Sequence, residues 1–531
     1  MHLGHIAGAY LPPDIFARYH RAIGDKTLMV SGSDVHGTPI TVKAEEEGVT
    51  PQEIVDRYHP QFLGHWRDLG IDFDLFTTTG TETHRRVTQG FFLELLENGY
   101  LYRKTVRQFF DPTQQRFLPD RYIEGTCPHC GYENARGDQC DNCGRTLDPA
   151  DLIEPRSKLS GAAPELRDTE HYYWKLSAFN EPMLEWLRSQ EGWRPHVLNF
   201  AVGMVEEGLH DRAFTRDLDW GIPLPVDDLG PGKSIYVWWE AVMGYYSAPQ
   251  EWAQLQGDPD AWRAWWQDPE AEAYYFVGKD NIPFHAVYWP ALLMGHGDLN
   301  LPTDVPANQY VTFGGSKASK SRGVGRSLQW YIDHFEPDAL RYAIAASFPE
   351  TNDTDLSDDE MVRRVNDELV STWGNLVNRV VSMTHRYFEG VVPEAVDLTS
   401  ADTALLDGID ATLAEVGEQI AAVKLRAGLS TAMAAASGVN VYLSEQKPWK
   451  SAKTDLARTG TTLAVALNAI SGLAVALAPY LPFTSRTVLE TLQFEVPQAG
   501  PRWVRESVPA GTVLGPAVPL FRKAELPNDE D

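Results

Sequence analysis

The sequence predicts an α/β protein whose parallel sheet is interrupted by an insertion and followed by an all-α region. Three observations predict this architecture. Short apolar runs alternate with helical patterns over residues 1–98 and again after residue 232, all four cysteines lie between these stretches, and a helical spacing of apolar residues begins after residue 357. With 531 residues, the chain is long enough for several domains of ordinary size.

The first predicted strand is the apolar run 27–30, which leads into a turn. In a parallel sheet, ligand-binding groups follow the carboxyl ends of the strands. The runs 234–239 and 273–277 are predicted as further strands of this sheet. The predicted division of this part of the chain is an α/β domain in two parts, 1–98 and 232–306, an insertion over 99–231, and a linker region over 307–356.

The last third of the chain, 357–531, is predicted to be a helical bundle. Ser357 begins a capping-box sequence. Apolar residues then recur at spacings of three and four, at Met361, Val365, Leu369, Trp373, Leu376 and Val380. The most apolar segment, 461–483, approaches the length of a membrane span, but Asn468 and Pro479 interrupt it. We therefore expect a buried bundle helix and no membrane span.

The chain is strongly acidic. It has 46 Lys and Arg residues against 74 Asp and Glu residues, a formal net charge of −28 at pH 7. This charge excludes affinity of the whole surface for nucleic acid or anionic lipid, so a polyanionic partner would need a local basic face. The first residues contain neither a basic leader nor a cleavage site, and we expect a cytoplasmic protein.

All four cysteines lie in one segment, 127–143, and predict a structural zinc site. They form two CxxC pairs, Cys127 with Cys130 and Cys140 with Cys143, and a glycine follows each pair. The glycines allow backbone amides to turn toward the thiolates, and four thiolates complete a closed tetrahedron that leaves no position for a substrate. Two disulfides, or free thiols in a redox motif, are the alternative.

Two motifs far apart in the sequence carry groups that suit a triphosphate. His2 and His5 flank Gly4 at the start of a helical pattern, where free amides favour phosphate and the glycine leaves room for a base. Farther along, Lys317 and Lys320 lie on a predicted loop that begins with a glycine pair. Alone, the first motif is equally typical of a helix cap, and the second of a solvated basic loop.

Together, these motifs resemble the HIGH and KMSKS signatures of the class I aminoacyl-tRNA synthetases. Further segments narrow the resemblance to the methionyl branch of that family, over essentially the whole chain. Besides the four-cysteine knuckle, these segments are GSDVHGTP at 32–39, YVWWEAVMGY at 236–245 and GKDNIPFH at 278–285.

The resemblance implies a Rossmann-like catalytic domain with a zinc-knuckle insertion and an all-α anticodon-binding domain. The implied activity is ligation of L-methionine to tRNA(Met), initiator tRNA included, through a methionyl-adenylate, with release of AMP and pyrophosphate. By similarity, ATP is bound by His2, Gly4, His5, Gly278, Asp280, Lys317, Ser319 and Lys320. Of these, the two histidines and the two lysines are the implied catalytic residues, and Mg²⁺ would accompany ATP.

A methionine pocket is also implied. Asp34 would hold the substrate ammonium and Arg216 would hold Asp34 in place, because an unpaired buried charge is costly. The thioether would lie among Trp238, Ala241, Tyr245, Phe284, His285 and Trp289, where each aromatic edge contributes about 0.3–1.5 kcal/mol. Considered singly, each aromatic is more typical of a core residue, and an ordinary surface ion pair is the alternative for Arg216.

On the predicted bundle, a polar stripe runs opposite the apolar one, at Asn375, Arg379, Ser382 and Arg386. Such stripes are usually only solvated. By similarity, however, Asn375, Arg386 and Trp449 bind the anticodon, and stacking one base on a tryptophan is worth about 1–3 kcal/mol. Relatives that dimerise often do so through an appended C-terminal domain, so the resemblance favours a monomer.

The sequence departs from the family in three places. Relatives carry a central strand before the HIGH motif, whereas His2 is the second residue here. We expect a misassigned start or a truncation, which would leave strand edges unpaired, open part of the substrate pocket and make the chain poorly active. Ala318 replaces the usual large residue of KMSKS, and Val242 stands where many relatives have proline.

Other functions stay open at this point. Class I synthetases for other apolar amino acids or for cysteine share both signatures, and small nucleotidyltransferases share HxGH. The chain is short for the large editing enzymes, and a closed four-cysteine site argues against a zinc ion that binds the amino acid. A zinc-knuckle RNA-binding paralogue without activity, or a fragment inactive through loss of its first strand, is the remaining alternative.

Overall fold

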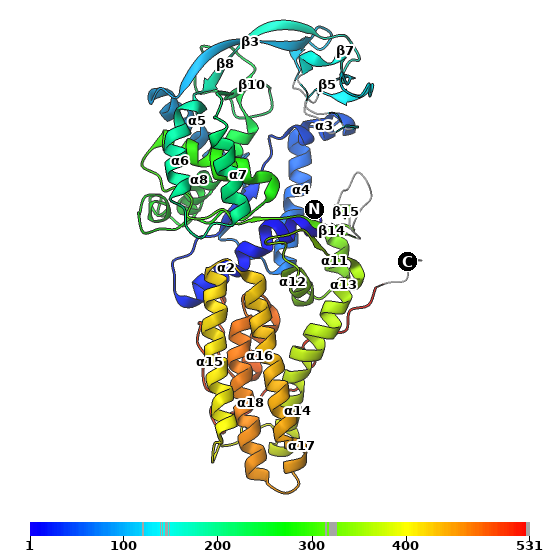
Figure 1. Ribbon diagram of the computed structural model, residues 1–531, viewed down its shortest axis with the longest axis vertical. Coiled ribbons are helices and arrows are strands. Elements are labelled where there is room, and N and C mark those ends of the chain that lie inside the picture. Colours follow the sequence, from blue (N-terminus) through cyan, green and yellow to red (C-terminus); the bar gives the residue numbers. More distant parts are fainter. Residues whose placement is uncertain are drawn as a thin grey trace.

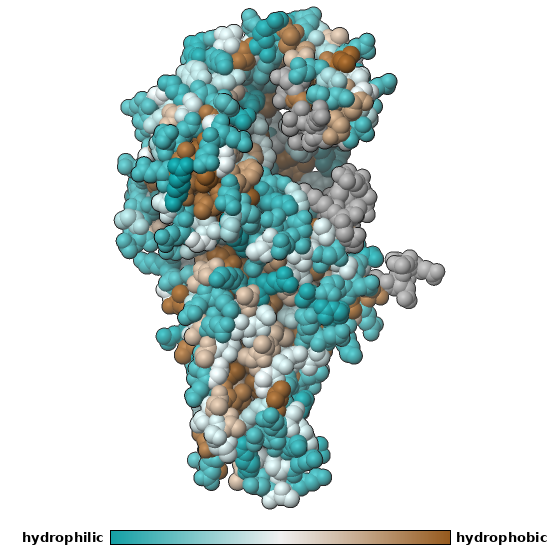
Figure 2. Space-filling model, in the orientation of Figure 1, coloured by the Kyte–Doolittle hydropathy of each residue, from teal (hydrophilic) through white to brown (hydrophobic). Residues whose placement is uncertain are grey.

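The computed structural model describes residues 1–118, 122–137, 140, 142–143, 147, 149–313, 316–317 and 326–526. An α/β body with a long β arm across its top forms one end of an elongated molecule, and a bundle of long helices forms the other (Figure 1). The face drawn in Figure 2 is largely hydrophilic over the body and the far end of the bundle, with smaller apolar patches between.

The parallel strands of the body form two separate pairs. β1 (Val30–Ser33) pairs with β2 (Leu75–Thr78), and β12 (Val277–Gly278) pairs with β13 (Ala307–Asn308). The α/β prediction is confirmed, but one continuous sheet is not found in the described ranges. A cavity of about 860 Å³ is lined by β1 on one side and by residues 274–278 on the other. Within the described ranges, each of these four strands pairs with one other strand.

The segment 234–239 is only partly a strand. β11 (Lys233–Ile235) pairs antiparallel with β10 (Thr215–Asp217), outside the parallel pairs, and the chain enters α8 (Val237–Leu255) two residues later. A short apolar run does not distinguish a strand from a buried helix by its periodicity. The prediction of a parallel strand here is wrong, because Trp238 and Trp239 lie on a helix whose sides face a cavity and the core.

Helices surround the two strand pairs. The first motif begins a helical run that is continuous from residue 3 to residue 23. The helices of the body are α1 (Leu3–His5), η1 (Ile6–Tyr10), α2 (Leu11–Ile23), α3 (Thr38–Glu47), α4 (Pro51–Leu69), α5 (Glu82–Glu97), α6 (Asn180–Arg188), α7 (Pro195–Glu206), α8, α9 (Arg263–Trp266), η6 (Phe284–Tyr288) and α10 (Trp289–His296).

The insertion forms the arm that crosses the top of Figure 1. Its long antiparallel pair is β3 (Leu101–Asp111) and β8 (Glu165–Trp174), flanked by β4 (Arg116–Phe117) and β9 (Arg212–Ala213). A small sheet beside the cysteines contains β5 (Ile123–Thr126), β6 (Ala135–Arg136) and β7 (Ile153–Ser157).

The linker region contains a small sheet and two helices. The sheet consists of β14 (Val311–Phe313), β15 (Ser316–Lys317) and β16 (Thr354–Asp355). The helices are α11 (Leu328–His334) and α12 (Pro337–Ala345).

The bundle prediction is confirmed, and all six residues of the predicted apolar repeat are buried. The helix α18 is long and apolar enough to cross a membrane by composition, but it lies buried in the bundle along almost its whole length. The helices of this region are α13 (Asp358–Arg363), η8 (Arg364–Gly374), α14 (Asn375–Phe388), α15 (Ser400–Ala421), α16 (Leu425–Gln446), α17 (Pro448–Ser451), α18 (Leu456–Leu477) and α19 (Pro482–Thr491).

A buried ion pair joins the body to the bundle. Arg341 on α12 and Asp14 on α2 are fully buried, with Nη2 and Oδ2 2.7 Å apart. The same guanidinium donates to the carbonyls of Leu69, Pro479 and Tyr480. Burial alone would raise the pKa of Asp14, but Arg18 and Arg341 reverse this effect and hold the pKa below its usual value. One side chain thus connects α2, the end of α4, α12 and the turn before α19.

Replacing Arg341 with methionine should destabilise the fold by about 3–5 kcal/mol, because the buried charge of Asp14 would lose one of its two arginine partners and keep only Arg18. Urea unfolding of the Arg341→Met variant measures this loss. The control is Arg363→Met, which removes an exposed guanidinium from α13 and should leave the unfolding midpoint nearly unchanged. Equal midpoints for the two variants would contradict the role of Arg341.

Candidate functional site

The cavity between the strand pairs collects most of the side chains predicted to bind an amino acid. Asp34, Trp238, Ala241, Tyr245 and His285 all line it. Asp34 follows β1, so this carboxylate lies at the carboxyl end of a parallel strand, as predicted. The remaining four residues come from α8 and η6.

The aromatic wall of the cavity is only partly as predicted. The rings of Trp238 and Phe284 stack with their centroids 4.0 Å apart, so Phe284 supports the wall. Trp289 is fully buried outside the cavity lining, and its Nε1 donates to the hydroxyl of Tyr275 at 3.0 Å. The indole is directed into the core of the body, against Phe91 and other aromatics, and the role of Trp289 in binding methionine stays a prediction.

Two polar side chains of the wall, Tyr245 and His285, form a hydrogen bond with each other. His285 Nδ1 lies 3.0 Å from the carbonyl oxygen of Asn281 and donates to it, so Nε2 accepts from the Tyr245 hydroxyl at 2.9 Å. Burial lowers the pKa of His285 to about 4, so the ring is uncharged at neutral pH. The wall thus offers aromatic carbon and lone pairs but no formal charge, a surface that suits an apolar, polarisable side chain.

Asp34 supplies a carboxylate in this neutral surrounding. Its Oδ1 accepts from the backbone N–H of His36 at 3.2 Å. Burial, followed by the negative charge of Glu240, raises the pKa of Asp34 to about 6. Asp34 is exposed at the lining of the cavity, so its carboxylate is accessible to a cationic partner such as an ammonium group.

The predicted pairing of Arg216 with Asp34 is not seen. The guanidinium of Arg216 lies over the ring of Tyr236, 4.0 Å from its centroid, and Nη1 donates to the carbonyls of Ala213 and Thr215. This part of the prediction is wrong for this structure, because Arg216 finds its partners close to its own strand.

The two histidines of the first motif cap the start of their helix. His2 Nδ1 accepts from the backbone N–H of Gly4 at 3.1 Å, and His5 Nδ1 accepts from the backbone N–H of His2 at 3.2 Å. An imidazole that accepts at Nδ1 carries its proton at Nε2, so both rings hold an Nε2–H donor. A Cβ at position 4 would lie 2.9 Å from the His2 ring, so Gly4 is required for this arrangement.

The second motif lies close to the first. β14 packs against α1 and pairs with β15, whose residue Lys317 is opposite Thr312. The backbone N–H of Leu328, just beyond the loop, donates to the carbonyl of Met1 at 3.2 Å. Ser319 and Lys320 lie outside the described residues, as does the side chain of Lys317. The described backbone nevertheless brings the two signature segments together from opposite ends of the catalytic half.

Gly278 and Asp280 lie at the rim of the same cavity region. Gly278 lines the cavity, and the carboxylate of Asp280 accepts from the hydroxyl of Tyr310. Next to them, Lys279 Nζ pairs with Asp353 at 2.9 Å. The end of β12 therefore presents polar groups beside the predicted amino-acid pocket.

The four cysteines form one cluster, and their geometry matches a tetrahedral metal site. Their Sγ atoms all lie within 4.8 Å of one another, with 3.9 Å between Cys127 and Cys143 and 3.6 Å between Cys130 and Cys140. A zinc tetrahedron with Zn–S bonds of about 2.3 Å has S···S edges of about 3.8 Å. The cysteines are free, so the disulfide alternative is not found. A hydrogen bond from Asn142 leads the effects that lower the pKa of Cys130 to about 6, which favours the thiolate that binds metal.

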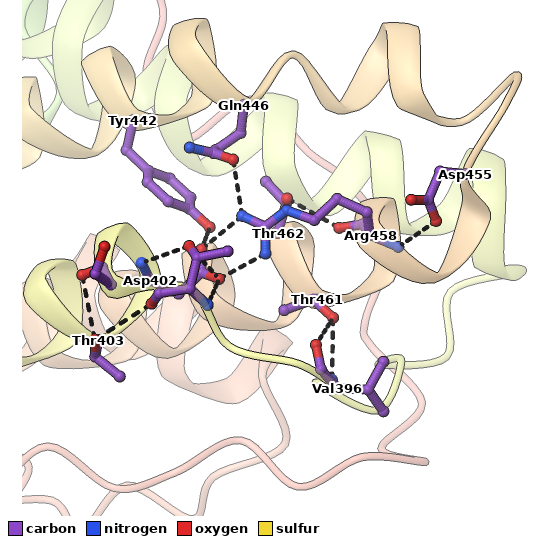
Figure 3. A network of polar contacts seen from close by, with 11 residues as sticks. Val396, Asp402, Thr403, Tyr442, Gln446, Asp455, Arg458, Thr461 and Thr462 are labelled. Carbon is purple, nitrogen blue, oxygen red and sulfur yellow. Dashed lines mark hydrogen bonds and ion pairs between the residues drawn. The ribbon is translucent and has the colours of Figure 1, made fainter.

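At the far end of the bundle, Trp449 on α17 is 36% exposed and lies beside Arg379, whose guanidinium is 5.6 Å from the ring centroid. Asn375 and Arg386 are on α14, the same helix as Arg379. A polar network holds the helix ends around α17 (Figure 3). In this network, Arg458 donates to Asp402 and to Gln446, and Tyr442 donates to Asp402 at 2.6 Å.

Sequence reasoning missed several residues of the site. Tyr10 and Asn281 line the cavity, and Glu240 and His84 are buried beside Asp34 and the cavity wall. Only Glu240 carried a visible signal, as a carboxylate inside the apolar run 235–243. The others are recognised only when distant segments are brought together.

Comparison with known proteins gives a consistent picture. A family model described as "tRNA synthetases class I (M)" matches residues 1–381, and one described as "Anticodon binding domain of methionyl tRNA ligase" matches residues 392–531. The methionine–tRNA ligase of Roseiflexus castenholzii is 49% identical, with 99% of this chain and 94% of that protein covered. The methionine–tRNA ligase of Thermomicrobium roseum is 48% identical at the same coverage.

A solved structure is also similar. The Mycobacterium tuberculosis methionyl-tRNA synthetase in complex with methionyl-adenylate superposes with a TM-score of 0.82, at 25% identity and with 98% of this chain and 96% of that chain covered.

We expect the purified chain to contain about one zinc ion, and Cys143→Ser to lose it, because three thiolates leave the tetrahedron incomplete. Elemental analysis of the metal content and thermal unfolding measure the loss. The control is His129→Ala, which removes a neighbouring exposed imidazole from the same turn and should retain the metal. Equal zinc content in the two variants would contradict the four-cysteine ligand set.

Proposed function

The chain belongs to the methionyl-tRNA synthetases of class I, and from this premise we propose that it ligates L-methionine to tRNA(Met), initiator tRNA included, with ATP as the energy source. The observation that carries the proposal is the cavity whose lining brings the carboxylate of Asp34 together with an uncharged aromatic wall, beside the helix of His2 and His5.

The amino acid would be held at both of its ends. The ammonium pairs with Asp34, and the thioether lies against Trp238, Tyr245 and His285, with Ala241 leaving room for it. Sulfur gains about 0.3–1.5 kcal/mol against each aromatic edge, whereas a charged side chain would find no partner in this wall. The pocket thus selects by polarisability and by the absence of charge.

The first reaction is attack of the methionine carboxylate on the α-phosphate of ATP, which forms methionyl-adenylate and releases pyrophosphate. The Nε2–H groups of His2 and His5 donate to the triphosphate, and the ammonium groups of Lys317 and Lys320 stabilise charge on the departing pyrophosphate. Gly278, Asp280, Ser319 and the backbone at Gly4 hold the rest of the nucleotide. Mg²⁺ bound to the pyrophosphate would add charge neutralisation.

The second reaction transfers methionine from the adenylate to the terminal ribose of the tRNA and releases AMP. Recognition of the tRNA takes place at the far end of the bundle, where Trp449 offers an exposed ring for a base and Arg379, Asn375 and Arg386 offer charge and hydrogen bonds. The positive charge on α14 supplies the local basic face that an acidic protein needs for a polyanionic partner.

Four further assignments belong to the proposal. The two strand pairs form the halves of a Rossmann-like nucleotide-binding domain, with the zinc-knuckle arm inserted between them. The zinc ion has a structural role, because four thiolates leave no open position for a substrate. The protein acts as a monomer in the cytoplasm. The predicted domain boundaries at 98, 231, 306 and 356 divide it.

Exchange of labelled pyrophosphate into ATP tests the proposed function. We expect exchange to depend on L-methionine and not on L-leucine or L-cysteine, because only methionine combines an unbranched thioether with the length of the pocket. Exchange with cysteine or leucine instead would identify another class I synthetase. No exchange with any of the three would overturn the enzymatic function and leave the RNA-binding alternative.

Replacing Trp449 with alanine should raise the KM for tRNA by about five- to 150-fold, because one stacked base contributes about 1–3 kcal/mol. Aminoacylation at varied tRNA concentration measures this change. Methionine-dependent pyrophosphate exchange serves as the internal control and should stay at the level of the unmodified chain, because the ring lies at the opposite end of the bundle from the body. An unchanged KM for tRNA would place anticodon recognition elsewhere.

A further inference from the structure

Glu240 is a fully buried carboxylate that the proposed mechanism leaves unused. It lies in the first turn of α8, between the cavity residues Trp238 and Ala241. Its Oε1 is 2.7 Å from Nδ1 of His36. Its Oε2 makes no hydrogen bond and lies 3.5 Å from Nε2 of His84. A buried carboxylate with an unsatisfied oxygen is costly, so its presence calls for a reason other than packing.

The contacts of Glu240 lead directly to Asp34. The loop after β1 is held at Val35, whose N–H donates to Thr79 Oγ1 at 3.0 Å and whose carbonyl accepts from Trp220 Nε1 at 2.8 Å. The next residue, His36, donates its backbone N–H to Asp34 Oδ1. Since the His36 side chain is anchored on Glu240, the carboxylate on α8 helps to fix the position of the N–H that orients Asp34.

Glu240 also acts on Asp34 through its charge. After burial, the negative charge of Glu240 is the second cause of the raised pKa of Asp34, whereas the hydrogen bond and the charge of His36 oppose it. Other titratable groups of the cavity wall are His84 on α5, which bonds Ser247 through Nδ1, and Tyr10, Tyr245 and His285. Burial raises the pKa of both tyrosines and lowers that of His285, so these three are uncharged at neutral pH. The same cavity is also lined by His20, Asp25, Lys26, Asp268, Glu270, Glu272, Tyr274 and Tyr275.

We propose that Glu240 is a positioning residue for capture of the amino acid: through His36, it orients the Asp34 carboxylate that receives the substrate ammonium. The proposal rests on the proposed function, in which Asp34 receives that ammonium. A protonated Asp34 is uncharged and cannot form an ion pair with the ammonium. A nearby negative charge makes Asp34 keep its proton up to a higher pH. Removal of the Glu240 charge should therefore shift the loss of affinity to lower pH.

Binding of L-methionine alone, followed by tryptophan fluorescence of the full chain between about pH 5 and about pH 8, tests the proposal, because the ligand keeps both of its charges over this range. For the unmodified chain, we expect affinity to fall below about pH 6, where Asp34 protonates. In Glu240→Gln, which keeps the shape and an acceptor for His36, the fall should begin at least about half a pH unit lower.

One further variant and a control test the direction of the shift in the pH at which affinity falls. His36→Asn removes the opposing imidazole charge, so the fall in affinity should begin at higher pH than in the unmodified chain. The control is Glu251→Gln, on the same helix, whose carboxylate accepts from Thr77 and Thr81. Its pH profile should match that of the unmodified chain. The ligand 2-hydroxy-4-(methylthio)butanoic acid, with hydroxyl in place of ammonium, should show no weakening below about pH 6 in any variant that is folded.

The outcomes distinguish failure of the role of Glu240 from failure of the proposed function. The role of Glu240 would be overturned if the pH profile of Glu240→Gln superimposed on that of the unmodified chain. This holds even if Asp34→Asn abolishes methionine binding, a result that would support the proposed function. Unchanged binding in Asp34→Asn would overturn both, because the ammonium would then pair elsewhere. Shifts of opposite sign in Glu240→Gln and His36→Asn would support the proposal, and a structural effect alone does not produce them.

Discussion

The ion pair between Arg341 and Asp14 is the contact on which the arrangement of the two halves depends. It joins the helix that follows the first signature motif to the helix that leads into the bundle, and it reaches the turn before α19 through backbone carbonyls. A charge buried this deeply is tolerated only in one geometry, in which every donor has an acceptor. The separation between the body and the anticodon end is therefore set by a contact that allows little variation.

The amino-acid pocket follows the opposite rule, because its carboxylate Asp34 makes no ion pair with a lysine or arginine of the described residues. Arg216 is engaged with Tyr236 and nearby carbonyls, and Tyr245 and His285 satisfy each other. The charge of Asp34 is left for the substrate, while Glu240 and His36 modulate it from behind the wall. In the proposed function, the ammonium of the amino acid supplies the cation that this carboxylate lacks.

The insertion is stabilised in a different way. Its residues between 122 and 157 have only a small apolar cluster, which includes Cys127 and Cys140 themselves. A metal held by four thiolates can contribute on the order of 10 kcal/mol to such a segment. The long pairing of β3 with β8 then connects this knuckle to the body, so the knuckle is held in place although its own apolar cluster is small.

The sequence by itself determined the class of the protein, the four metal ligands and the bundle core, because each of these is encoded in residues that are close along the chain. Tertiary structure alone decided which side chains share an environment. Asp14 and Arg341 are 327 positions apart, and His36 and Glu240 are 204 apart, so no local pattern predicts either pair. The same reason explains why Arg216 does not pair with Asp34 and why the run 234–239 is only partly a strand: a residue type indicates what a side chain can do, but the packing of distant elements decides which partner it meets.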